Sequence, residues 1–107
     1  MEKYKVVDLK CIMSLNKRKD VLTSYELMNN HSITLGQNFH LDYKITINGI
    51  EEDKVGILFY EDPNKPARAI KISKEQDFTH TIGIPPIYLT IKLEDIREVQ
   101  SNGIVYR

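Results

Sequence analysis

The chain has 107 residues, and its 15 basic and 15 acidic side chains give a formal net charge of zero. This length fits one domain, so we expect a single domain over residues 1–107. An apolar share of 41% and a charged share of 28% are ordinary for a folded globular protein and exclude a disordered chain. The balanced charge argues against nucleic acid as a partner, because no net field attracts a polyanion.

Three further features predict a cytoplasmic location. No run of residues approaches the roughly 18 consecutive apolar positions of a membrane span, which also argues against a membrane as a partner. The amino-terminal residues Met-Glu-Lys-Tyr-Lys contain no apolar signal-peptide core. The lone cysteine, Cys11, cannot close a disulfide within the chain, whereas small secreted frameworks depend on such bridges.

The amino-terminal part of the chain contains one clear strand pattern and one ambiguous segment. Residues Val7 to Leu15 alternate between apolar and polar, which predicts a strand with one buried face. In the segment 20–28, Val21, Tyr25 and Met28 have helical spacing, whereas alternate positions from Val21 onward suit a strand equally well. We therefore expect either a strand or a short helix near residues 20–28.

The most regular alternation in the chain runs from Ile33 to Asn48. Its apolar residues occupy odd-numbered positions throughout, which predicts one strand with a buried and a solvated face. We expect Gly36 to form a bulge or kink within this strand. Asn48-Gly49 then predicts a turn, because both residues tolerate positive φ.

The remaining chain predicts further short strands. Residues 55–60 are apolar on both faces, as in a strand at the centre of a sandwich. Shorter alternations predict strands at 68–72, 78–84 and 87–93. Residues 98–101 and 104–106 flank Asn102-Gly103, which predicts a hairpin. Seven or eight short strands predict an all-β fold, either an antiparallel β-sandwich that is immunoglobulin-like in the broad sense or a small barrel.

The candidates for catalytic or metal chemistry are His40, Asp42, His80 and Cys11. His40 and Asp42 are two residues apart and share a face of the expected strand, so with His80 they would offer two imidazoles and one carboxylate to a metal ion. No His-x-x-x-His spacing or Gly-rich nucleophile turn accompanies them, and Cys11 has the phase of a core residue. We therefore expect no catalytic site, no metal site and no cofactor.

Three tyrosines are the candidate partner-binding residues. Tyr60 and Tyr88 are out of phase with the buried residues of their strands, as are Val6 and Ile12 in the first strand. If one sheet carried these side chains on its outer face, it would present an apolar surface of the kind tyrosine favours at interfaces. Tyr106 lies in the carboxy-terminal hairpin, which would be an edge for strand addition. We expect Tyr60, Tyr88 and Tyr106 to contact a partner.

These observations favour a non-catalytic protein-interaction module, such as a small adaptor, inhibitor or assembly protein. It would bind a protein partner through a sheet face, the end loops or an edge strand. The first alternative is a carbohydrate-binding sandwich that uses tyrosines as stacking platforms, although the chain has no tryptophan. The second alternative is a small metal-dependent or Cys/His-dependent enzyme. The same exposed face could also join two copies of the chain in a homo-oligomer.

Overall fold

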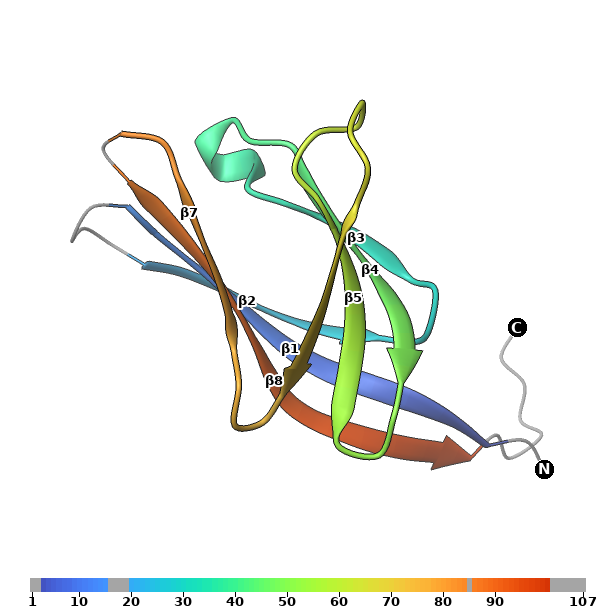
Figure 1. Cartoon of the computed structure of the whole chain (residues 1–107). Coiled ribbons are helices and arrows are strands. Elements are labelled where there is room, and N and C mark those ends of the chain that lie inside the picture. Colours follow the sequence, from blue (N-terminus) through green and yellow to red (C-terminus); the bar gives the residue numbers. More distant parts are fainter. Residues whose placement is uncertain (1–2, 16–19, 85, 101–107) are drawn as a thin grey trace, which may run out of the picture.

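The computed structural model describes residues 3–15, 20–84 and 86–100 (Figure 1). Within these residues the chain forms eight strands and one short 3-10 helix. The strands of one sheet are β1 (Lys3–Leu15), β2 (Asp20–Leu27), β7 (Phe78–Ile82) and β8 (Ile87–Gln100). Those of the other are β3 (Ser32–Leu35), β4 (Tyr43–Ile50), β5 (Lys54–Tyr60) and β6 (Arg68–Ser73), and η1 (Gln37–Phe39) joins β3 to β4.

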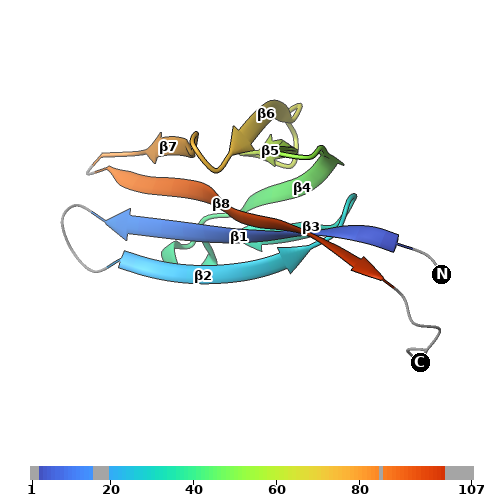
Figure 2. The ribbon, with the colours of Figure 1, turned by 90° about the horizontal axis from the view of Figure 1, so that it is seen from below.

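The strands form two antiparallel sheets of four, which confirms the all-β sandwich. We call them sheet A, with the order β2-β1-β8-β7, and sheet B, with the order β3-β4-β5-β6. Figure 2 shows the strands of sheet A spread out side by side, with β2 at the margin of the sheet. Successive strands are neighbours around the sandwich, so the connections are those of a meander and not the Greek key of an immunoglobulin domain. The first and last strands, β1 and β8, pair with each other.

The core lies between the inner faces of the two sheets. In β1 every second residue from Val7 to Met13 is buried, and in β8 the same holds from Leu89 to Leu93. Sheet B contributes Ile45 and Ile47 from β4 and three consecutive buried residues, 55–57, from the central strand β5. No polar or charged residue of the described chain is fully buried. Successive side chains of a strand point to opposite faces of the sheet. The alternation in the sequence therefore places aliphatic side chains inward and polar side chains outward.

The ambiguous segment 20–28 is a strand, β2, and the helical interpretation was wrong. β2 pairs with β1 in an unbroken antiparallel register from Val7–Leu27 to Ser14–Asp20. The strand forms its ladder of backbone hydrogen bonds with β1 and buries Leu27 at the end of its inner face. An isolated short helix would lack this support, because helix stability at such lengths depends on tertiary packing.

The prediction of one strand from Ile33 to Asn48 was also wrong, because the chain reverses direction inside this segment. Gly36 (φ 85°) and His40 (φ 59°) adopt left-handed conformations on either side of η1. The chain then folds back, so that β3 and β4 pair antiparallel, with Ile33 opposite Ile45. β3 and β4 both place their odd-numbered residues on the inner face. The alternation in the sequence therefore continues through the chain reversal and gives no sign of it.

The expected turn at Asn48-Gly49 is instead a bulge within β4. The β4–β5 register shifts between Ile47 and Ile50, Gly49 has φ 102°, and the turn follows at residues 51–53. The bulge brings the carbonyl of Asn48 close to Gly56 on β5, where an added Cβ would lie 2.3 Å from the Asn48 oxygen. Glycine at position 56 therefore makes this close approach sterically feasible.

The strand predictions at 7–15, 55–60 and 68–72 are confirmed by β1, β5 and β6. β7 ends at Ile82, two residues before the predicted end, and β8 is longer than predicted because it continues to Gln100. β8 stays paired with β1 along this extra length through a bulge. Leu9 pairs with Leu93 and Asp8 with Asp95, so Glu94 has no counterpart on β1. The second strand of the predicted carboxy-terminal hairpin lies outside the described residues.

Candidate functional site

The exposed apolar side chains of the described chain gather on sheet A. Four large hydrophobic residues are exposed there: Leu22 (56%) on β2, Tyr88 (42%) on β8, Tyr4 (37%) on β1 and Ile84 (99%) in the turn from β7 to β8. No strand of sheet B carries an exposed large hydrophobic residue among those described. The two outer faces of the sandwich therefore differ in character.

Three of the outward residues form what we call the outer cluster: Ile12, Leu22 and Tyr88. Ile12 pairs directly with Leu22 on β2, which places their Cβ atoms about 5 Å apart. On the other side Ile12 pairs with Thr90 and Ser14 with Tyr88, so Ile12 and Tyr88 are diagonal neighbours. The cluster thus crosses three strands and is bordered by the hydroxyls of Ser14 and Thr90.

Sequence reasoning found part of this cluster. Tyr88 and Ile12 were both expected to point away from the core, and the structure places both on the outer face of sheet A. Leu22 was missed because the segment 20–28 was left undecided between strand and helix. Pairing with β1 fixes Leu22 on the outer face, since its neighbours Val21 and Thr23 belong to the inner phase.

Paired charges occupy the middle of the same face. Arg97 donates from Nε to Asp8 Oδ2 (2.7 Å) and from Nη2 to Asp8 Oδ1 (2.8 Å), and Nη2 also donates to Glu26 Oε2 (2.6 Å). The hydrogen bonds to Asp8 hold the pKa of Arg97 above its ordinary value. Lys10 pairs with Glu94 at 3.0 Å. Two cations thus pair with three carboxylates, and the outer cluster is the apolar end of a face whose centre is occupied by ion pairs.

Tyr60 lies on the opposite side of the molecule, on the outer face of sheet B. It lines a shallow hollow of about 210 Å³ together with Thr34, Asp42, Lys44 and Pro63. Lys44 Nζ lies 5.2 Å from the centroid of the Tyr60 ring, a cation–π contact that covers one face of the ring. The structure therefore does not bring Tyr60 and Tyr88 together on one surface. The third predicted contact, Tyr106, lies outside the described residues.

The candidate grouping of His40, Asp42 and His80, which the sequence offered but did not favour, does not form. In the described part of the chain, no three His, Cys, Asp or Glu side chains are close enough to hold a metal ion. Asp42 lines the Tyr60 hollow, and His40 is an exposed residue at the end of η1.

His80 has a packing environment of its own between the two sheets. Its ring centroid lies 5.1 Å from that of Phe59, 5.9 Å from Tyr43 and 6.3 Å from Phe78. Its Nε2 is 3.5 Å from Glu61 Oε2. Burial, and secondarily the charge of Glu61, raises the pKa of Tyr43. This cluster joins β7 of sheet A to β4 and β5 of sheet B, which gives the aromatic rings a packing role.

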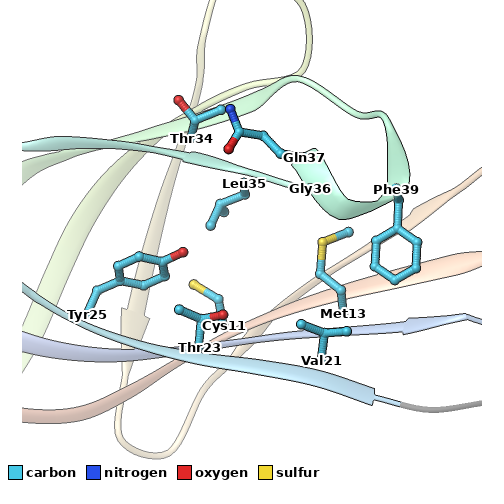
Figure 3. Close-up of a pocket in the computed structure, with 10 residues that line it drawn as sticks. All are labelled: Cys11, Met13, Val21, Thr23, Tyr25, Thr34, Leu35, Gly36, Gln37 and Phe39. Carbon is cyan, nitrogen blue, oxygen red and sulfur yellow. The ribbon is translucent and has the colours of Figure 1, made fainter.

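Cys11 lines a cavity of about 120 Å³ between the sheets (Figure 3). β1 and β2 form one wall and β3 and η1 the other, and Figure 3 shows the sulfur atoms of Cys11 and Met13 and the hydroxyl of Tyr25 at the same space. Burial raises the pKa of the Cys11 thiol to about 12. A thiol with such a pKa stays protonated at neutral pH and is a poor nucleophile. The lining contains no histidine.

Within the described residues, no helix has the length and apolar character to cross a membrane. Comparison with protein-family models, with curated proteins and with solved structures gave no match. The functional proposal therefore depends on the geometry of this chain alone.

Proposed function

We propose that this protein is a non-catalytic protein-interaction module of the cytoplasm, a small adaptor, inhibitor or assembly protein, and that it binds its partner through the outer face of sheet A. The observation that carries the proposal is the segregation of exposed apolar side chains. Among the described residues, Tyr4, Leu22, Ile84 and Tyr88 all belong to sheet A or to its β7–β8 turn. Aromatic and aliphatic side chains gathered on one face are the usual centre of a binding surface.

The composition and size of this face support the proposal. Interfaces concentrate their binding energy in a few central apolar or aromatic residues surrounded by polar ones, which is the arrangement of the outer cluster among Ser14 and Thr90. At about 4.8 Å between strands and about 3.3 Å per residue, the four strands of sheet A give it an outer face of about 630 Å². This is the order of the roughly 800 Å² per partner that a stable complex buries.

The surroundings of the two side chains that could act as a nucleophile or a general base, Cys11 and His80, support a non-catalytic role. Cys11 is buried with its pKa raised to about 12, so it is held in its unreactive form. His80 is enclosed by aromatic rings that join the two sheets, which gives it a structural explanation. Packing in the core therefore explains the positions of both residues without a catalytic role.

Affinity capture from a lysate of the source cells, followed by quantitative mass spectrometry, tests the proposal. The baits are the wild-type chain, Leu22→Ser, Tyr88→Ser, and Tyr60→Ser as the matched control on sheet B. We expect one protein at near-equal stoichiometry with the wild type and with Tyr60→Ser, and its loss with Leu22→Ser and Tyr88→Ser. Capture that is insensitive to both sheet A substitutions, or the absence of any stoichiometric partner, would overturn the proposal.

Carbohydrate binding is the second candidate, and the hollow at Tyr60 is the observation that favours it. Asp42 and Lys44 there supply a carboxylate and an ammonium group beside an aromatic ring, as sugar hydroxyls and a pyranose face require. Titration with a glycan panel, followed by tyrosine fluorescence, separates the two candidates. A saturable change that disappears in Tyr60→Ser would establish sugar binding, and a flat response across the panel would remove this candidate.

A further inference from the structure

β2 is an edge strand with one free side. It pairs only with β1 in the described structure, because sheet A has the order β2-β1-β8-β7. The ladder from Asp20 to Leu27 has no bulge, so the backbone N–H and C=O groups of alternate residues point away from the sheet at regular spacing. A free edge of this kind is a template for another strand.

The other three edge strands are shorter or carry more basic charge than β2. β3 has four residues and β7 has five, while β6 carries Arg68 and Lys71 and follows Pro66. β2 has eight residues, and none of them is Pro, Lys or Arg. Its five central residues, 21–25, are uncharged. β2 therefore lacks the short length, basic charge, proline and bulges that commonly prevent strand addition.

The cavity described above lies directly beside this free edge. Val21, Thr23 and Tyr25, the inner-phase residues of β2, form one side of it, and Leu35 and Phe39 belong to the other side (Figure 3). A strand added to β2 would point every second side chain toward sheet B, and therefore toward this space. Its volume of about 120 Å³ fits one aliphatic side chain, since a cavity of about 150 Å³ holds benzene.

We propose that β2 binds an extended segment of a partner protein by strand addition, and that one apolar side chain of that segment, of Val to Leu size, fills the cavity between β2 and β3. The inference goes beyond the proposed function, because it gives sheet A a second contact with a protein partner, at the β2 edge and separate from the outer cluster. Backbone hydrogen bonds along β2 supply affinity, and the cavity supplies preference for an apolar residue at one position.

Charge on β2 favours a different protein over a second copy of this chain. A two-fold antiparallel pair centred on Thr23 would place Asp20 opposite Glu26 at both ends of the ladder, and directly opposed like charges destabilise a sheet. A partner segment with neutral or basic residues at these positions avoids the repulsion. The occupant is therefore a segment with an apolar residue in the inner phase and no acidic residue facing Asp20 or Glu26.

This inference is tested with a display library of random peptides, which is selected for binding to the full chain. The variants are Thr23→Lys, which puts a charge at the cavity, and Ser24→Gln, an uncharged change at its outer-phase neighbour, with Tyr88→Ser marking the outer cluster. We expect enriched peptides with apolar residues at alternate positions, whose affinity falls at least about tenfold in Thr23→Lys, since a charge there must be desolvated by the bound strand. Ser24→Gln and Tyr88→Ser should change affinity far less. Bound peptide should also slow amide hydrogen exchange in β2.

Three results would overturn the inference. The first is a library without enrichment. The second is a set of peptides that depend on Tyr88 and not on Thr23, which would support the outer face as the binding surface and reject strand addition. The third is concentration-dependent self-association of the free chain that Thr23→Lys abolishes, measured by sedimentation, which would make the occupant a second copy. Circular dichroism of each variant confirms that the comparison is between folded proteins.

Discussion

The guanidinium of Arg97 on β8 binds both carboxylate oxygens of Asp8 on β1, although the two residues are 89 positions apart in the chain. The donor–acceptor distances are 2.7 Å from Nε to Oδ2 and 2.8 Å from Nη2 to Oδ1. The pair lies beside the β8 bulge, where Asp8 is opposite Asp95. Because Nη2 also reaches Glu26 on β2, one arginine links three strands of sheet A.

The number of hydrogen bonds that each carboxylate accepts predicts its contribution to stability. Asp8→Asn should lower the free energy of unfolding more than Glu26→Gln, because Asp8 accepts two charge-assisted bonds from Arg97 and Glu26 accepts one. Urea unfolding of both variants, each with and without Arg97→Met, measures the coupling in double-mutant cycles. Equal coupling of Arg97 to the two carboxylates would contradict the expectation.

Two glycines near the β4 bulge should respond differently to alanine. Gly56→Ala should lower the free energy of unfolding by about 3 kcal/mol, because the new Cβ would meet the backbone oxygen of Asn48 on the neighbouring strand. Gly49→Ala has open space around it and should cost about 1 kcal/mol, from its positive φ alone. Chemical denaturation compares them, and a larger loss in Gly49→Ala would show that the bulge is misplaced.

Two adjacent aromatic residues on β5 should contribute very differently to stability. Phe59 is 1% exposed and packs against Tyr43, Phe78 and His80, so Phe59→Ala should cost about 3–5 kcal/mol of unfolding free energy. Tyr60→Ala, one residue along on the outer face, should cost less than about 1 kcal/mol. Thermal unfolding followed by circular dichroism gives both values. Similar losses at the two positions would contradict the assignment of Tyr60 to the solvated face.

The buried thiol of Cys11 predicts a loss of stability at alkaline pH. Burial raises its pKa from 9.0 to about 12, so the folded chain holds the thiol proton more tightly than the unfolded chain. This contribution is complete below about pH 9 and is lost as the pH rises toward 12, by at most about 1.4 kcal/mol per pH unit. Cys11→Ala lacks it, so the stability of the wild type relative to this variant should fall above about pH 9. A pH-independent difference, measured under reducing conditions, would contradict the prediction.

Residue alternation was enough to predict the sandwich, because burial on one face of a strand is a local property of the sequence. It correctly placed Ile12 and Tyr88 in the outward phase and Cys11 in the core. It could not reveal the reversal between β3 and β4, since two antiparallel strands that share a phase look like one strand. The left-handed conformations of Gly36 and His40, which mark the reversal, leave only a glycine as a signal in the sequence.

Which of the two sheets a strand joins depends on its pairing with strands far away in the sequence. The alternation of apolar and polar residues within one strand carries no information about that pairing. Tyr60 and Tyr88 are both outward residues, but β5 belongs to sheet B and β8 to sheet A, so they face away from each other. The same limit explains why Leu22 was missed. Its position beside Ile12 follows from the β1–β2 register, which depends on the pairing of the two strands.

The claim that the outer face of sheet A binds a protein is tested most directly by methyl NMR of the labelled chain with the captured partner. We expect the methyl signals of Ile12 and Leu22 to shift or broaden at equimolar partner. The methyl signals of Leu58, which lies in the outward phase of β5, should stay unchanged. Perturbation of Leu58 with Ile12 and Leu22 unaffected would place the binding surface on sheet B and contradict the account.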